Sequence, residues 1–139
     1  MMNHRGLILL AHGAREPAWA APFEAVAARV LERAPETHVR LAFLELMAPS
    51  LEVAATELAA LGCQRVDVVP VFLGTGGHVR RDVPAQLARL RDAHPGMAWT
   101  LHQALGETPH VISALADAAI DLAELGFASG HSPLDGIGT

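Results

Sequence analysis

The sequence predicts an α/β fold with three layers, in which a mainly parallel four-stranded sheet lies between helices. Two observations carry this prediction. Short apolar runs alternate four times with segments of helical periodicity along the 139 residues. The first run is almost entirely apolar, as expected for a strand that is buried on both faces. The length fits one domain with a core of its own, and we expect residues 1–127 to form it.

The first half of the chain contains two strand–helix pairs. Residues 6–11 are an apolar run of the length of one buried strand. Apolar side chains recur at spacings of three and four over residues 19–31, which predicts an amphipathic helix that ends before Pro35. Residues 38–46 predict the second strand. The helix that follows is expected from its N-cap, Ser50, to Gly62.

The second half repeats the alternation. Residues 65–73 predict the third strand, and a glycine-rich turn follows at 74–77. The apolar positions over residues 79–90 predict the third helix, and residues 97–101 predict a weaker fourth strand. A threonine and a proline then start a last helix over residues 108–126. We expect the turn-forming residues 128–139 to be a flexible tail.

Composition excludes several classes of function. The net charge is −5 and all ten basic residues are arginine, which argues against a nucleic-acid binder with a basic face. An apolar fraction of 51% argues against disorder. Neither a signal peptide nor a run of about 20 apolar residues is visible, so no membrane association is expected. The single cysteine, Cys63, permits no internal disulfide, and a cytoplasmic location is expected.

Polar side chains gather at the carboxyl ends of the predicted strands, where open parallel sheets bind ligands. His12 follows the first strand, Glu45 lies late in the second, and His78 follows the turn after the third. Two imidazoles bind cobalt, nickel, iron or zinc ions, but are too few for a closed structural site, which favours a metal in transit. Simpler interpretations remain open: His12 bonding its own loop, His78 capping a helix, and Glu45 pairing with an arginine.

The same edge carries candidates for binding the rest of a ligand. Arg15, Arg80 and Arg81 are candidates for bidentate hydrogen bonds to substrate carboxylates. The alternative is that these arginines only face the solvent. The turn lacks the ending of a P-loop, so Gly76 and Gly77 are more plausibly small residues that let a flat ligand approach the backbone. The other six histidines are expected to have no role at the site, with His102 the least certain; they are His4, His38, His94, His102, His110 and His131.

Several segments of the sequence together resemble those of one protein family. The chain resembles the small sirohydrochlorin-type class II chelatases, the single-domain cobaltochelatase or ferrochelatase group, over residues of about 5–126. One departure is Ala14, where the commoner pattern has serine, and it puts a minor contact in doubt. The segments that carry the resemblance are His12-Gly13-Ala14-Arg15, Trp19, Pro22-Phe23, Phe43-Leu44-Glu45, Pro49-Ser50-Leu51, and the runs 69–73 and 76–84.

The resemblance implies insertion of a divalent metal into sirohydrochlorin or a related tetrapyrrole without ATP, in cobalamin or sirohaem biosynthesis. It implies that His12 and His78 bind the metal, with Co²⁺ first and Fe²⁺ or Ni²⁺ as alternatives, and that Glu45 assists. The metal is a substrate, and no permanently bound cofactor is expected. Longer relatives hold two such halves in one chain, which implies a homodimer for this one.

Two other functions are compatible with the sequence. A cobalt or nickel carrier or sensor would use the same histidines without catalysis. A flavodoxin-like nucleotide-binding protein is suggested by the fold alone. Acceleration of metal insertion would favour the chelatase, whereas a retained nucleotide would favour the flavodoxin-like alternative.

Overall fold

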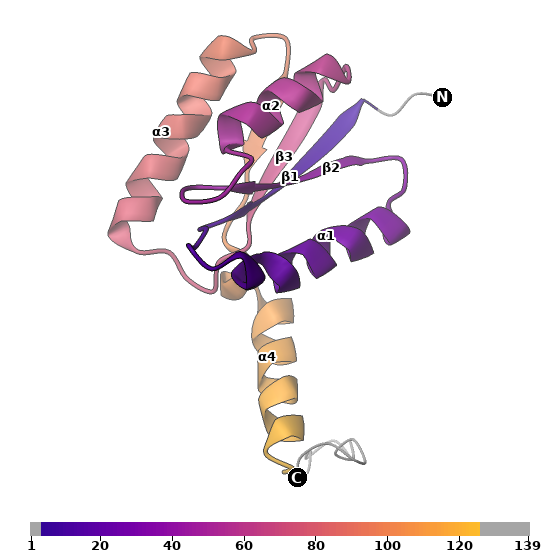
Figure 1. Ribbon diagram of the computed structural model, residues 1–139, viewed down its shortest axis with the longest axis vertical. Helices are drawn as coiled ribbons and strands as arrows, with labels where there is room; N and C mark the ends of the chain where they lie inside the picture. Colours follow the sequence, from indigo (N-terminus) through magenta and orange to yellow (C-terminus); the bar gives the residue numbers. More distant parts are fainter. Residues whose placement is uncertain (1–3, 126–139) are drawn as a thin grey trace. The chain divides into compact units, whose positions relative to one another are not determined.

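The structure is a computed structural model that describes residues 4–125. Its centre is a four-stranded sheet with the spatial order β2-β1-β3-β4, in which every neighbouring pair is parallel (Figure 1). The predicted α/β class is confirmed. The strands are β1 (Arg5–Ala11), β2 (His38–Phe43), β3 (Arg65–Pro70) and β4 (Ala98–Leu101).

Helices cover both faces of this sheet. A short 3-10 helix, η1 (Pro17–Ala20), leads into α1 (Ala21–Arg33) on one face. The other face carries α2 (Leu51–Ala60) and α3 (Gly77–Ala93) (Figure 1). Strand alternation explains the two-sided burial, because successive residues of β1 point to opposite faces.

The larger core lies between the sheet and the helices α2 and α3. It contains Ile8 and Leu10 from β1, and Leu58 and Leu87 from the two helices, all four of them fully buried. A smaller cluster under α1 is built from Ala11, Ala20, Phe43 and the partly buried side chains Trp19, Phe23, Leu41, Met47 and Val71.

Two predicted strands end earlier than expected. β2 stops at Phe43 rather than at residue 46, because the chain bends back and the Phe43 N–H donates to the Pro49 carbonyl at 2.9 Å. Leu46 has a positive φ of 65° within that bend, which extended backbone does not allow. β3 stops at Pro70 rather than at residue 73, with the Val71 N–H still bonded to the Leu10 carbonyl.

The predicted boundaries of α2 are confirmed. Ser50 is its N-cap, and the Ser50 Oγ accepts a hydrogen bond from the Val53 N–H at 3.2 Å. Gly62 follows the last turn with a φ of 82°, a left-handed conformation that glycine adopts without strain.

The chain divides into two compact units between Leu105 and Gly106. A 3-10 turn, η2 (Leu105–Glu107), spans this boundary, and the second unit contains α4 (Pro109–Leu122) with Thr108 as its N-cap. The expected single domain over residues 1–127 stays a prediction, and the expected tail at 128–139 lies outside the described residues.

α4 is shorter than predicted. It ends at Leu122, and Glu124 follows with a left-handed φ of 58°. The Leu125 N–H then donates to the Ile120 carbonyl, closing the helix with a bond across six residues. No residue of α4 is buried, and its exposed apolar side chains are Ile112, Leu115 and Leu122. In the described part of the chain, no helix is both long and apolar enough to cross a bilayer.

Candidate functional site

His12 is the first residue after β1, at the centre of the sheet. Its ring stacks on Phe72, with ring centroids 4.2 Å apart and planes inclined by 28°. Phe72 is buried and follows β3, the strand next to β1. The stacking therefore holds the His12 imidazole between the ends of the two central strands, where the strand order reverses and open sheets bind ligands.

Glu45 lies beside His12, although it is not in a strand as predicted. It belongs to the bend after β2, and its N–H donates to the His12 carbonyl at 3.1 Å. The preceding N–H, of Leu44, donates to the Ala11 carbonyl at 2.9 Å. These two bonds continue the β1–β2 pairing past the strand ends, so the bend stays next to the loop that carries His12.

Gly13 is required by this close approach, and the sequence reasoning did not single it out. Its φ is 99°, a conformation that side chains rarely tolerate. A Cβ added at Gly13 would overlap the Glu45 carbonyl oxygen. The glycine after His12 therefore lets the Glu45 backbone pack directly on the loop.

His78 lies in the first turn of α3, which has Gly76 as its N-cap. The His78 side chain is 84% exposed. The His78 Nε2 lies 2.8 Å from the Oδ2 of Asp82, which is one turn further along the helix. Residues four apart share a helix face, so the local geometry of α3 is sufficient to make this pair.

One cavity of about 310 Å³ brings together the three residues that the sequence predicts to act on the metal. His12, Glu45 and His78 line it, with Leu44 and Val79 as apolar walls. The remaining lining residues are Asp82 and Gln86, neither of which was predicted as part of the site. The spacing of four from His78 to Asp82, and again to Gln86, is the sequence signal that would have indicated both.

The cavity contains two imidazoles and two carboxylates. Among residues 4–125, no three or more His, Cys, Asp or Glu side chains are grouped so that they could hold a metal ion. The two imidazoles are fewer than the four protein ligands of a closed structural zinc site.

The three predicted arginines are exposed and none of them lines the cavity. Arg15 lies in the bend after His12, and Arg81 lies on the first turns of α3. Arg80 donates from its Nε to the Thr75 Oγ1 at 3.0 Å, across the glycine-rich turn. Their contacts with substrate carboxylates stay a prediction.

Gly76 and Gly77 stay candidates for ligand approach. A Cβ added at either position would meet no atom within 4 Å, so the fold itself leaves room for a side chain there. Neither has a positive φ. Packing within the chain therefore does not explain these glycines, and their role in ligand binding stays a prediction.

His102 is engaged elsewhere in the fold. It follows β4, its Nε2 lies 2.9 Å from the Asp67 Oδ1, and it does not line the cavity. Asp67 is the buried polar residue of the sheet and also accepts from Arg5 at 3.4 Å. Burial alone would raise the pKa of Asp67, but hydrogen bonds from His102 and Arg5 and their charges outweigh it and lower that pKa. These contacts support a structural role for His102.

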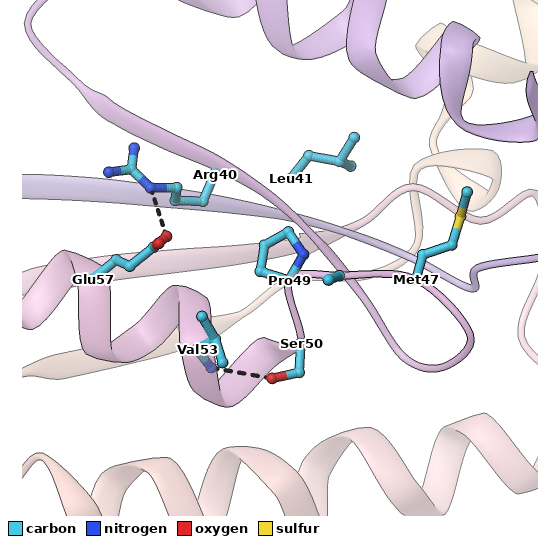
Figure 2. Close-up of a pocket in the computed structure, with 8 residues that line it drawn as sticks. Arg40, Leu41, Met47, Pro49, Ser50, Val53 and Glu57 are labelled. Atoms are coloured by element: carbon cyan, nitrogen blue, oxygen red, sulfur yellow. Dashed lines mark hydrogen bonds and ion pairs between the residues drawn. The ribbon is translucent and has the colours of Figure 1, made fainter. Parts of the chain in front are cut away.

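A larger pocket of about 690 Å³ lies at the outer edge of β2 (Figure 2). Arg40 and Glu57 form an ion pair of 3.1 Å at one end of it, and the pocket contains no histidine. No predicted site residue lines it, so size alone does not identify the functional cavity. Its other lining residues are Leu41, Met47, Ala48, Pro49, Ser50 and Val53.

The chain is similar to sirohydrochlorin cobaltochelatases from several archaea. A sirohydrochlorin cobaltochelatase from Methanopyrus kandleri is 36% identical over 81 residues, which are 58% of this chain and 57% of that protein. The corresponding protein from Methanocaldococcus jannaschii is 34% identical over 88 residues, covering 63% of this chain and 62% of the other. The chain thus spans a little over half the length of these curated relatives.

Solved structures share the fold. A cobalamin (vitamin B12) biosynthesis CbiX protein from Marinobacter aquaeolei VT8 matches with a TM-score of 0.77 and 33% identity, over 86% of this chain and 98% of the other. The sirohydrochlorin chelatase SirB from Bacillus subtilis subspecies spizizenii, solved with cobalt, matches with a TM-score of 0.74. That match covers 86% of this chain and 51% of SirB at 23% identity, and it shows the fold alone.

The family model described as CbiX matches residues 6–122, which include both cavity histidines and the acidic residues beside them. With this match over most of its length, the chain belongs to the CbiX family.

Proposed function

We propose that this protein inserts a divalent metal, Co²⁺ first, into sirohydrochlorin or a related tetrapyrrole without ATP. The observation that carries the proposal is the shared cavity of His12, Glu45 and His78, which come from three separate segments of the chain. Membership of the CbiX family and relatives named sirohydrochlorin cobaltochelatase support the same reaction.

The two imidazoles supply ligands that suit Co²⁺, Fe²⁺ and Ni²⁺. The His12 ring is held by its stack on Phe72, so it is oriented before the metal arrives. The open shell matters because the ion has to leave the protein for the ring. A site with two imidazoles binds less tightly than a closed four-ligand site and leaves positions for the tetrapyrrole nitrogens.

Insertion also moves protons. The metal forms bonds to the ring nitrogens as two pyrrole N–H bonds break, so M²⁺ enters and two protons leave. Glu45 is exposed, lies in the bend next to His12 and lines the cavity, which suits a carboxylate acceptor for these protons. A histidine released by the departing metal is the second candidate acceptor.

The substrate carries several carboxylates, and the α3 end of the site suits them. Arg80 and Arg81 lie on the first turns of α3, and Arg15 follows His12. The free N–H groups at the α3 N-terminus add a favourable dipole for anions. Gly76 and Gly77 leave open space there for a flat ring.

The assembly that we propose is a homodimer. The fold of this chain matches about half of the SirB chain, and a second copy of this chain would supply the other half of the working enzyme. The exposed apolar side chains of α4 give a surface for such a contact. The proposed setting is the cytoplasm, where the buried thiol of Cys63 stays reduced.

The dimer is tested by light scattering after gel filtration. Wild type is expected at twice the chain mass, and Leu115→Glu, at an exposed position of α4, is expected to shift toward the monomer. Leu73→Glu, exposed in the first unit, is the matched control. A wild-type monomer at all concentrations would contradict the homodimer.

The reaction is tested by mixing the protein with sirohydrochlorin and Co²⁺ under nitrogen and following the absorption spectrum of the ring. Enzyme should accelerate insertion over the uncatalysed rate, and ATP should have no effect. Tight Co²⁺ binding without acceleration would favour a metal carrier or sensor instead. Parallel assays with Fe²⁺ and Ni²⁺ at buffered free concentrations rank the metals.

A further inference from the structure

Asp82 is the second carboxylate at the cavity. It lines the cavity with His12, Glu45 and His78, and its side chain is 49% exposed. Its Oδ2 lies 2.8 Å from the Nε2 of His78, well inside hydrogen-bond range. The carboxylate therefore touches one of the two proposed metal ligands directly.

This contact distinguishes the two nitrogens of the His78 ring. A carboxylate accepts hydrogen bonds and does not donate them, so the bonded Nε2 must carry the proton. In a neutral imidazole the other nitrogen, Nδ1, then holds the free lone pair. A metal ion needs that lone pair, so the bond to Asp82 and coordination through Nε2 exclude each other.

Metal-binding histidines commonly donate their second N–H to a carboxylate, which fixes the tautomer and the orientation of the ring. The pair in α3 has this arrangement. His78 needs such support more than His12 does, because the His12 ring is stacked on Phe72, whereas the His78 side chain is 84% exposed. Without Asp82, an exposed ring would rotate among several rotamers.

We propose that Asp82 is a positioning residue, which binds the Nε2–H of His78 so that Nδ1 is the nitrogen offered to the metal. This inference rests on the proposed function, because it takes His78 as a ligand of the incoming ion. It assigns Asp82 an effect on capture of the metal and none on recognition of the tetrapyrrole.

The first experiment uses Zn²⁺ alone, as a diamagnetic stand-in, on the full chain labelled with ¹⁵N. Long-range proton–nitrogen correlation spectra at about pH 8 show which His78 nitrogen shifts on binding, with His78→Ala identifying its signals. Wild type should coordinate Zn²⁺ through Nδ1. Coordination through Nε2 in wild type would break the bond to Asp82 and overturn the proposal.

The second experiment separates orientation from charge in the insertion assay. Asp82→Ala should raise KM for Co²⁺ about tenfold, with KM for sirohydrochlorin unchanged. Asp82→Asn should have a KM for Co²⁺ close to that of wild type, because its amide oxygen still accepts from Nε2–H although the charge is gone. If KM for Co²⁺ is raised as much in Asp82→Asn as in Asp82→Ala, the charge of Asp82 is what matters and the proposed positioning role is wrong.

Asp92→Ala is the matched control, since it removes an exposed carboxylate from the last turn of the same helix. It should leave both KM values unchanged. Alanine favours helix more than aspartate does, so loss of folding is not expected in either variant. Zinc coordination is measured without tetrapyrrole, so a failure of the chelatase assay and a failure of the Asp82 assignment give different results.

Discussion

Two histidine–aspartate pairs of this protein have almost the same length and different surroundings. His78 and Asp82 lie 2.8 Å apart on α3, with side chains 84% and 49% exposed. His102 and Asp67 lie 2.9 Å apart across β4 and β3, and the Asp67 side chain is only 12% exposed. The first pair faces a cavity with a second imidazole, whereas the second joins neighbouring strands and bonds Arg5.

The difference shows that a short bond does not by itself identify a functional pair. The Asp67 carboxylate is removed from water, so its partners compensate a desolvation cost that the exposed Asp82 does not carry. Removing a partner should therefore reduce stability in one pair and activity in the other. If substitutions in both pairs reduce stability and activity alike, this distinction between the pairs is wrong.

The largest expected effect is on activity at the cavity. His12→Ala and His78→Ala should each reduce the rate of cobalt insertion at least about a hundredfold, because each removes one of two imidazole ligands. The unfolding midpoint should change little for His78→Ala, whose side chain is mostly exposed. Initial rates with sirohydrochlorin and Co²⁺ measure the loss.

His102→Ala is the control for this experiment and should retain the wild-type rate per folded molecule. Full activity of His12→Ala would show that the cavity is not the metal site. A loss of insertion in His102→Ala without unfolding would remove the distinction between the two pairs.

The next effect is on stability at the buried pair. Asp67→Ala should lower the free energy of unfolding by about 2 kcal/mol, because it removes the carboxylate that accepts hydrogen bonds from His102 and Arg5. Asp82→Ala should change it by less than about 0.5 kcal/mol, as expected for an exposed pair. Urea denaturation followed by circular dichroism measures both, and equal losses would contradict the comparison.

The smallest expected effect is the change with pH in the stability that Asp67 and its partners contribute. The pKa of Asp67 is lowered in the folded state from the ordinary value of 3.8, so its contribution is present above that value. It is lost as the pH falls through the lower folded pKa, since the protonated carboxyl no longer pairs. The stability difference between wild type and Asp67→Asn should therefore shrink below about pH 4 in urea titrations. A difference that is constant down to about pH 2 would contradict the lowered pKa.

The elements of the fold could be predicted because their signals are local. Ser50 and Gly62 delimit α2 as expected, and the apolar runs gave four parallel strands. The ends of β2 and β3 could not be predicted from apolar content. The bend after Phe43 depends on a bond to Pro49 and on the approach of the chain to His12, which no local pattern shows.

The site was predictable in part for the same reason. His12 and His78 follow strands whose carboxyl ends share one edge, a rule that needs only strand order. The histidine at 131 has no described structure, so its expected lack of a role stays a prediction. No role was predicted for Gly13 or Asp82, because each acts through a contact, one with the Glu45 carbonyl and one with the His78 ring.

The sequence by itself determined the alternation of strands and helices, the family and the candidate ligands, because periodicity, capping residues and residue type act over a few positions. Only the tertiary structure decided which polar residues share a cavity. It places His78 at the cavity and pairs His102 with the buried Asp67, since burial and partners depend on chain segments far apart in sequence. These surroundings support the proposal that His78 binds the metal and that His102 has a structural role.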